Sequence, residues 1–380
     1  MKKLSVVMLV LCVLCCAVCG AFAKDIPDEI SIGVIGSITG AQSAGGESMR
    51  KAIAVVSTET GDCITIDGKD VKVNWIFEDS ASDSEKAVQA ALKLIDNDGV
   101  IAIIGPENSS EAIAAASIAQ EAGIPLITTT GTNNAITETG DYIFRVCMSD
   151  DVQGQIAAKF AAKQLGLTTA AVIYDSTDVF SSGLYQSFEA AFTEYGGTIV
   201  DVETFEGSEA VLFGTDGSNL ETCGAELIYV PVHHDNAAWI LKYIKNAGID
   251  AAVLGPDSWD YNAMVENTGA SVLEGVYFTS GFAAEIPSAE AFALEYILIN
   301  GTNPGFNSAM TYEAAEIILH AAANAATIDG AGLRDAIAAA KETDLPTGPV
   351  SFDSFGNAVK SGIVKQFSDG MRTYVASVAP

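Results

Sequence analysis

A short polar segment at residues 105–110, GPENSS, follows a predicted buried strand at 100–104 and begins a predicted helix that extends towards Ala122. Ser109 stands at the start of that helix. A helix start offers unpaired backbone N–H groups and the positive end of the helix dipole, so Ser109 could bind a carboxylate through its hydroxyl and its backbone. An ordinary N-cap serine has the same pattern, and on position alone it is the simpler interpretation.

A second polar group follows the next predicted strand, at 124–129, where the chain reads Thr130-Gly131-Thr132. Adjacent parallel strands end at the same edge of a sheet, so we expect these residues to lie near Ser109. Threonine hydroxyls both donate and accept hydrogen bonds, and the backbone at Thr130 offers a carbonyl. This edge could therefore bind a carboxylate and an ammonium together. A polar strand end followed by a turn, with no ligand, would have the same sequence pattern.

Asp257 follows Gly255-Pro256 at the end of a predicted strand, 251–254, in the second half of the chain. Its carboxylate could complete the ammonium site from the opposite side. Taken alone, an aspartate at this position is more simply a turn or cap residue. The three strand ends together predict a site for a small molecule that carries both charges.

The elements that must position these residues alternate between short β-rich runs and helical patterns. Within 88–95, for example, Val88, Ala91, Leu92 and Ile95 keep the spacing of a buried helix face. Repeated alternation of this kind predicts a parallel sheet with helices on both faces. It occurs twice, so the predicted fold class is α/β with two doubly wound lobes. The predicted strands are 30–35, 71–77, 100–104 and 124–129 in the first unit, and 171–174, 198–202, 227–232 and 251–254 in the second.

The C-terminal part changes character, because a strand at 275–282 leads into three helical patterns and two hairpin segments, 350–359 and 363–375. Segments that return to both lobes predict several crossovers. We expect lobe one to comprise 24–147 and 279–349, and lobe two to comprise 148–278 and 350–380.

The N-terminal sequence is typical of an export signal. Lys2 and Lys3 precede an apolar stretch at 4–18, and Ala21-Phe22-Ala23 predicts cleavage after Ala23. A retained anchor helix and a lipid anchor at Cys19 are the alternatives, but the stretch is short for a membrane span and the flanks of Cys19 do not fit a lipobox. The expected mature chain is exported and free, in the periplasm or another extracytoplasmic space.

The formal charge of the 380-residue chain is −30, from 19 basic and 49 acidic residues, and loss of the signal would make it more negative. Such a charge excludes nucleic acid as a partner and repels anionic ligands at long range. Any bound carboxylate must therefore be held by local donors. The simplest interpretation of the acidity is a strongly hydrated surface suited to a salty environment.

Patterns typical of enzymes, metals and cofactors are missing from the sequence. The glycine-rich stretch 36–46 lacks GxGxxG spacing, and no Walker motif or GxSxG elbow occurs. His233-His234-Asp235 has only His320 as a further histidine, which argues against a metal site. The mature cysteines, Cys63, Cys147 and Cys223, are odd in number and match no zinc or redox spacing. We therefore expect a binding protein with no cofactor.

Several motifs along the chain together resemble the branched-chain amino-acid binding proteins of ABC transporters, over nearly the whole mature chain. They are GPxxSS at 105–110, GIPLI at 123–127, YxFR at 142–145, QG at 153–154, GPD at 255–257 and TGPVSFD at 347–353. The resemblance implies a type I periplasmic-binding-protein fold, with two Rossmann-like lobes, three hinge crossovers and closure over the ligand.

Transferred position by position, the resemblance implies that Ser109 and Thr132 donate to a ligand carboxylate, and that the Thr130 carbonyl accepts from the ammonium. Asp257 becomes the counter-charge of the ammonium. The family often has glutamate at this position, so a water could bridge the shorter side chain.

The predicted side-chain pocket departs from that of leucine-type binders. Gly45 stands where leucine-type binders have an aromatic residue of the first loop, which would leave room for a ligand. Glu107 and Asn108 occupy positions that are more apolar in those binders, and Phe180 and His233 occupy positions that are often tyrosine. Phe306 is a further predicted pocket residue. Phe180 and His233 could equally be core or loop residues. The pattern predicts a ligand side chain larger or more polar than that of leucine.

The resulting functional hypothesis is a monomeric extracytoplasmic solute-binding protein that captures an amino acid and delivers it to the permease subunits of an ABC transporter. Two alternatives stay open: a periplasmic ligand sensor, which needs the same closing cleft, and a binder of another small molecule such as an aromatic acid or amide.

Overall fold

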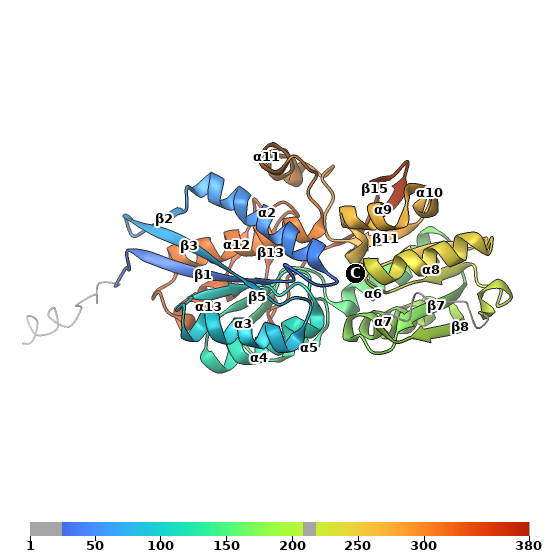
Figure 1. Ribbon diagram of the computed structural model, residues 1–380, viewed down its shortest axis with the longest axis horizontal. Coiled ribbons are helices and arrows are strands. Elements are labelled where there is room, and N and C mark those ends of the chain that lie inside the picture. The colour runs from blue at the N-terminus through green and yellow to red at the C-terminus, as the bar shows by residue number, and fades with distance from the viewer. Residues whose placement is uncertain (1–24, 208–217, 380) are drawn as a thin grey trace, which may run out of the picture.

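The structure is a computed structural model that describes residues 25–207 and 218–379. It consists of two α/β lobes that lie side by side (Figure 1). The predicted signal peptide lies outside the described residues. Within the described ranges, every helix is too short or too polar to cross a membrane.

Lobe one is built on a six-stranded sheet in the order β2-β3-β1-β4-β5-β6. All neighbours pair in parallel except β2, which forms an antiparallel hairpin with β3. The hairpin turn contains Asp67 and Gly68, both at positive φ, which suits the twist of the two strands. The strands are β1 (Glu29–Gly36), β2 (Cys63–Ile66), β3 (Lys69–Asp79), β4 (Ala102–Ile104), β5 (Leu126–Thr128) and β6 (Ile143–Arg145).

Helices cover both faces of this sheet because the buried residues of each strand alternate between them. In β4, Ala102 and Ile104 pack towards α2 and α12, whereas Ile103 packs towards α3 and α4. Figure 1 shows these two pairs of helices on opposite sides of the strands. The helices of lobe one are α2 (Ser43–Thr60), α3 (Ser84–Asp96), α4 (Ser109–Ala122), α5 (Ala135–Glu138), α11 (Glu290–Asn300), α12 (Phe306–Asn324) and α13 (Gly330–Ala338).

Lobe two is built on a seven-stranded sheet in the order β15-β14-β11-β10-β9-β7-β8. The five strands β7 to β11 are parallel to one another, and the C-terminal hairpin of β14 and β15 adds two antiparallel strands at one edge. The strands are β7 (Thr169–Asp175), β8 (Thr198–Phe205), β9 (Leu227–Tyr229), β10 (Ala252–Gly255), β11 (Tyr277–Ser280), β14 (Gly362–Ser368) and β15 (Met371–Val378).

The two faces of the second sheet are likewise covered by different helices. One core joins the sheet to α6 (Asp150–Lys159) and α7 (Val179–Glu194), and the other joins it to α8 (His234–Asn246), α9 (Asn262–Thr268) and α10 (Ala270–Leu273). The prediction of two doubly wound α/β lobes is therefore confirmed.

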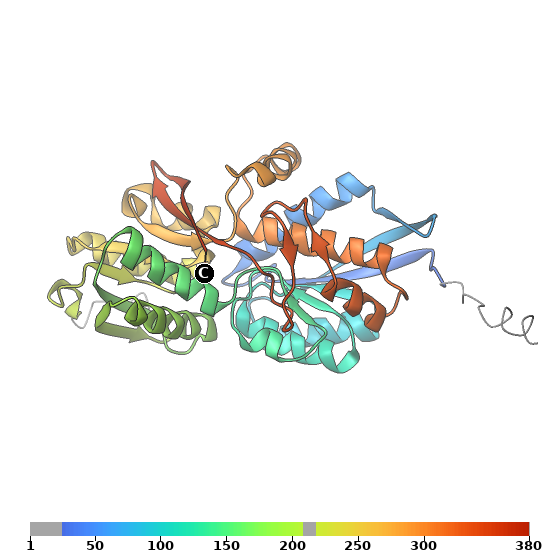
Figure 2. The same cartoon turned by 180° about the vertical axis from the view of Figure 1, so that it is seen from behind.

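The chain passes between the sheets three times, between β6 and α6, between β11 and α11, and before β14. Figure 2 shows the last passage, where the red chain runs from lobe one to lobe two. Residues before this passage pack on lobe one: β13 (Val350–Ser351) pairs with β12 (Lys341–Glu342), and Asn357 bridges to Arg145. The segment 350–358, assigned to lobe two from sequence, thus lies against lobe one.

Candidate functional site

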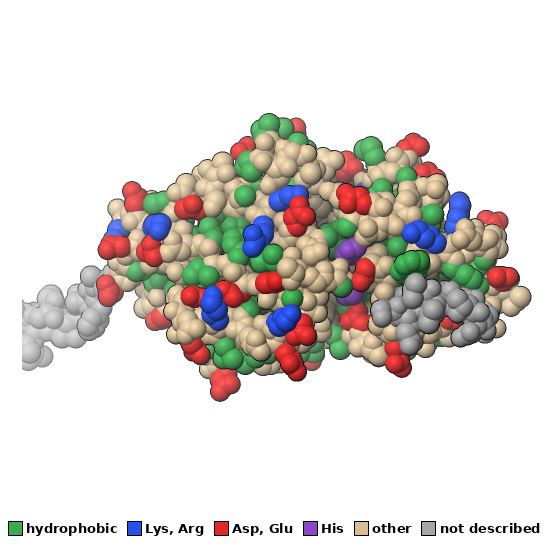
Figure 3. Space-filling view, viewed as in Figure 1, with side chains coloured by type: hydrophobic (Ala, Val, Ile, Leu, Met, Phe, Trp, Pro, Cys, Tyr) green, Lys and Arg blue, Asp and Glu red, His purple; other side chains and the backbone are tan. Residues whose placement is uncertain are grey.

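A small cavity lies between the lobes, at the carboxyl ends of their parallel strands. Lobe one contributes residues from the segments that follow β4 and β5, together with the segment before α2 and the start of α12. Lobe two contributes residues from the starts of α7 and α8 and from the segment after β10. Figure 3 shows histidine side chains at the junction of the lobes. The lining residues are Gln42, Glu107, Asn108, Ser109, Thr130, Phe180, His233, Asp257, Ser258, Tyr261 and Phe306.

Eight of the ten predicted binding residues therefore line one cavity, and Thr132 and Gly45 do not. Gln42, Ser258 and Tyr261 were missed. Ser258 and Tyr261 belong to the segment that begins with Asp257, so a search of the whole strand-end loop would have found them. Gln42 lies in the glycine-rich stretch, which carried no pattern of its own.

Ser109 is the first residue of α4, and its hydroxyl joins two strand ends. Ser109 Oγ accepts hydrogen bonds from the backbone N–H groups of Thr132 at 3.2 Å and Asn133 at 3.3 Å. The interpretation of Ser109 as an ordinary N-cap is wrong, because the N-cap is Asn108. With two N–H groups already donating to its oxygen, the hydroxyl proton of Ser109 remains available to a ligand oxygen.

Thr132 lies beside Ser109 and is completely buried. Its hydroxyl oxygen, Oγ1, has no close hydrogen-bond partner among the described residues, although it lies near the carboxyl of Asp150, whose pKa burial raises and the Thr132 hydroxyl lowers. Buried hydroxyls without a hydrogen-bond partner are rare in proteins, so the Thr132 hydroxyl is a candidate donor to a ligand or a water. Ser109 and Thr132 thus offer two hydroxyl donors at one sheet edge, which matches a carboxylate.

The loop that carries these threonines is held by a buried arginine. Arg145 Nη1 donates to the carbonyls of Thr132 and Asn133, the latter at 2.8 Å, and its Nε donates to Asn357 at 3.1 Å. Arg145 therefore positions the loop without contacting the cavity. The signal for it was the YxFR motif, in which Arg145 follows two buried residues of β6. Cys147 is buried beside the same loop, where burial raises the pKa of its thiol well above the usual range.

Asp257 begins a short 3₁₀ turn, η4 (Asp257–Trp259), directly after β10. Its backbone N–H donates to Gln153 Oε1 at 2.9 Å, and its carboxylate oxygen Oδ2 is buried without a partner among the described residues. Burial, and then the nearby charge of Asp150, raises the pKa of Asp257 to about 8. An ammonium group beside Oδ2 would relieve both effects.

Thr130 lies at the opposite side of the cavity from Asp257, in lobe one. Its hydroxyl donates to the backbone carbonyl of Glu107 at 3.0 Å, which ties the ends of β4 and β5 together. Its own carbonyl belongs to the loop that lines the cavity, so Thr130 and Asp257 face the same space from different lobes.

Phe180 and His233 form a stacked pair in lobe two, with ring centroids 4.6 Å apart and an angle of 22° between the planes. His233 Nε2 lies 3.4 Å from Asp178 Oδ2. Burial alone would lower the pKa of His233, but the hydrogen bond and charge of Asp178 outweigh it and raise the pKa to about 9. His233 is therefore a cation at neutral pH, and its Nδ1 has no partner among the described residues.

Glu107 is a buried acidic residue, only 3% exposed. Its Oε1 accepts a hydrogen bond from the backbone N–H of Ser37 at 2.9 Å. Burial, and then the charge of Glu111, raises the pKa of Glu107 to about 8. A Cβ at Gly45 would lie 2.7 Å from Glu107 Oε1, so the expectation that Gly45 leaves room for the ligand is corrected: the carboxyl of Glu107 fills that space.

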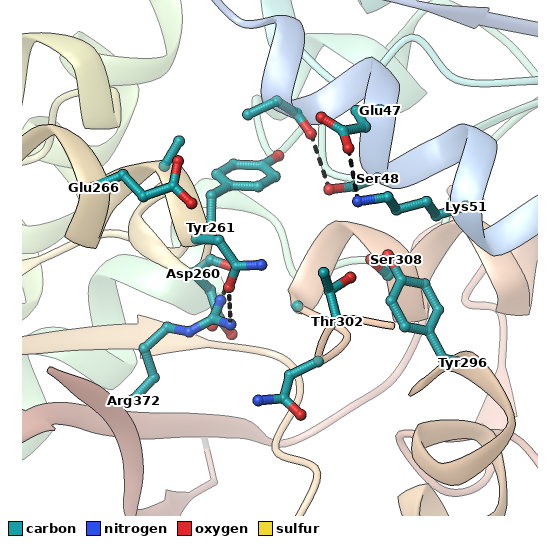
Figure 4. Close-up of a pocket in the computed structure, with 15 residues that line it drawn as sticks. Glu47, Ser48, Lys51, Asp260, Tyr261, Glu266, Tyr296, Thr302, Ser308 and Arg372 are labelled. Carbon is teal, nitrogen blue, oxygen red and sulfur yellow. Dashed lines mark hydrogen bonds and ion pairs between the residues drawn. The ribbon is translucent and has the colours of Figure 1, made fainter. Parts of the chain in front are cut away.

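A second cavity of about 280 Å³, shown in Figure 4, shares Tyr261 with the first. Four of its five charged groups are already paired: Arg372 Nη1 lies 2.8 Å from Asp260 Oδ1, and Lys51 Nζ lies 2.6 Å from Glu47 Oε1. None of the described buried polar atoms that lack a partner belongs to its lining. The first cavity, which has several such atoms, is the better candidate site.

Comparisons with known proteins agree with this geometry. A family model described as periplasmic binding protein matches residues 29–370. The chain is 28% identical over 316 residues to an amino acid binding protein of Pseudomonas aeruginosa, covering 82% of each chain.

Two solved structures illustrate the range of similar proteins. A leucine binding protein from Thermotoga maritima is 28% identical, with a TM-score of 0.85 and coverage of 92% of this chain and 99% of that one. A solute binding protein of an ABC transporter from Rhodopseudomonas palustris, in complex with 3,4-dihydroxybenzoic acid, is 25% identical, with a TM-score of 0.80 and coverage of 93% and 97%.

Proposed function

Because the chain belongs to the periplasmic binding protein family, we propose that it is the extracytoplasmic solute-binding protein of an ABC transporter and that it captures an amino acid between its lobes. The observation that carries this proposal is that one cavity is lined by the Ser109 hydroxyl from lobe one and by the unpartnered Asp257 Oδ2 from lobe two, each at a strand end. One suits a carboxylate and the other an ammonium. An α-amino acid carries both groups on one carbon.

The mechanism follows from the division of the site between the lobes. The ligand carboxylate binds Ser109 and Thr132 in lobe one, and the Thr130 carbonyl accepts from the ammonium. Closure of lobe two then brings Asp257, Phe180 and His233 onto the ligand through bending at the three chain passages. Net charge cannot attract the carboxylate, since the chain carries −30, so these local donors supply the affinity.

Contacts between the lobes support closure around the cavity. Asn133 Nδ2 of lobe one donates to the Val179 carbonyl of lobe two at 3.0 Å, and α4 packs against α7. A closed pair of lobes presents one continuous surface, which the permease subunits of a transporter can distinguish from the open form. We propose those subunits as the partner and a monomer as the working form.

An aromatic acid is the ligand of one similar protein, and the ring pair of Phe180 and His233 could pack against such a ring. An aromatic acid without an amine would leave Asp257 buried and unpaired, which costs free energy. The amino acid is therefore the better match to the whole cavity.

A thermal-shift experiment tests the proposal. The mature chain, residues 24–380, is refolded from denaturant to remove bound ligand and then screened against amino acids, the corresponding carboxylic acids that lack the amine, and the corresponding amines that lack the carboxylate. We expect at least one amino acid to raise Tm, because stabilisation grows with ligand concentration over Kd. Equal shifts with the deaminated acids would contradict the proposed ammonium site.

A further inference from the structure

Two polar atoms of the cavity remain unused once the amino-acid head group is bound. Glu107 Oε2 is buried and has no hydrogen-bond partner among the described residues, while its Oε1 is occupied by the Ser37 N–H. The carboxyl fills the space beside Gly45, where an added Cβ would lie 2.7 Å from Glu107 Oε1. A buried carboxyl oxygen without a partner is costly, so we expect a ligand to supply one.

His233 supplies the second unused atom, from the other lobe. The ring is held in place by its stack on Phe180 and by Asp178, which lies 3.4 Å from Nε2. Because Asp178 keeps the ring protonated, Nδ1 carries a hydrogen, and that N–H is buried without an acceptor. The cavity therefore retains one carboxyl from lobe one and one N–H donor from lobe two.

Resting on the proposed function, we propose that the ligand is an amino acid with an uncharged side chain that both donates and accepts hydrogen bonds, a carboxamide or a hydroxyl, which joins Glu107 to His233. Glu107 is then a specificity-determining residue. A carboxamide or a hydroxyl can donate to Oε2 when the carboxyl is ionised or accept from it when the carboxyl is protonated, and either group can also accept from Nδ1.

The same two residues disfavour the other classes of amino acid. An aliphatic side chain would leave both polar atoms unsatisfied, and sites built for hydrogen bonding reject such analogues strongly. The charge on His233 repels a basic side chain. An acidic side chain would have to lose its water beside the buried carboxyls of Glu107 and Glu111, the latter of which accepts from Asn108 Nδ2 at 2.6 Å. The cavity is small and is walled by Tyr261 and Phe306, which also favours a small side chain.

Isothermal titration calorimetry on the refolded mature chain tests this inference. The titrants are serine, threonine, asparagine and glutamine, against leucine, isoleucine, valine, lysine and glutamate. We expect at least one of the first four to bind about tenfold or more tightly than all of the last five. Comparison of the hydroxyl amino acids with the carboxamide amino acids shows which side-chain group binds Glu107 and His233. An aliphatic or charged amino acid that binds equally well overturns the inference.

Two variants test whether Glu107 and His233 cause the preference for a polar side chain. Glu107→Leu removes the acceptor, and His233→Phe removes the donor but keeps a ring to stack on Phe180. Each should weaken binding of the preferred amino acid by about tenfold or more while leaving binding of leucine unchanged or tighter. Glu107→Gln retains an oxygen for the Ser37 N–H and serves as a second test if Glu107→Leu does not fold.

The matched control is Glu121→Leu, at the exposed end of α4, which should change neither affinity. Variants that weaken all amino acids equally would show that Glu107 and His233 do not select the side chain, and would overturn the inference. If amino acids bind without polar preference, the proposed function stands and the inference fails. If none binds, both fail.

Discussion

Gln42 Nε2 of lobe one donates a hydrogen bond to Asp235 Oδ1 of lobe two over 3.1 Å. Gln42 precedes α2 and also lines the cavity, whereas Asp235 lies in the first turn of α8. Because the two residues belong to different lobes, their bond depends on closure. It offers a way to alter closure through a residue outside the proposed head-group site.

Gln42→Ala should weaken ligand binding by about two- to tenfold, because one intramolecular hydrogen bond contributes about 0.5–1.5 kcal/mol. We expect most of the change in the dissociation rate, since the bond holds the closed form. Stopped-flow fluorescence with the ligand found by calorimetry measures both rate constants.

The control is a double-mutant cycle with Asp235→Ala. If the bond is the cause, Gln42→Ala should have little further effect in the Asp235→Ala background. Equal losses in both backgrounds would mean that Gln42 acts through ligand contact alone.

Ser109→Ala combined with Thr132→Ala should abolish measurable binding, because two hydrogen bonds to a charged carboxylate are lost, worth about 3–6 kcal/mol together. The ligand-free Tm should fall modestly as well, because Ser109→Ala leaves the backbone N–H groups of Thr132 and Asn133 without their acceptor. Ser117→Ala, on the exposed face of α4, is the matched control. Unchanged affinity in the double variant would rule out the carboxylate site.

The strand-end residues could be predicted from sequence because parallel sheets bring the carboxyl ends of their strands to one edge. Ser109, Thr130 and Asp257 follow β4, β5 and β10 directly, so their placement needs only the strand order. Gln42 depends on how the lobes close on each other, which no local pattern encodes. The β2–β3 hairpin, by contrast, was missed although Asp67-Gly68 is a typical hairpin turn.

Gly45 illustrates a different limit. The sequence shows that position 45 has no side chain. Which group fills the resulting space depends on the side-chain conformation of Glu107, which lies in a distant loop. The interpretation as ligand space was therefore wrong, although the position does shape the site. Arg145 could have been singled out, because a charged residue after two buried strand residues requires buried partners.

Arg145→Lys should destabilise the protein by about 2 kcal/mol or more and weaken ligand binding, because a lysine cannot donate to the Thr132 and Asn133 carbonyls and to Asn357 together. Urea denaturation measures the stability and calorimetry the affinity. Arg334→Lys is the control, since the ion pairs of Arg334 with Asp141 and Asp335 lie at the surface, and should cost at most about 1 kcal/mol. Similar losses in both variants would contradict a special role of Arg145.

The pH dependence of affinity tests the role of Asp257. In the ligand-free protein the pKa of Asp257 is raised to about 8 by burial, so the carboxyl is mostly protonated at pH 7. Pairing with an ammonium requires the ionised form, so binding releases a proton, and affinity should fall as pH decreases below about 8, by at most about tenfold per pH unit.

Asp257→Asn should weaken binding by about 1.5–3 kcal/mol, the contribution of a hydrogen bond to a charged group, and should flatten this pH profile. Asp250→Asn, an exposed aspartate of the same lobe, should leave the profile of the unsubstituted protein intact. Calorimetry in two buffers of different ionisation enthalpy reports the proton released at pH 7. Proton release that persists in Asp257→Asn would assign the titration to another group, whereas its loss together with the pH slope would identify Asp257 as the counter-charge of the ligand ammonium.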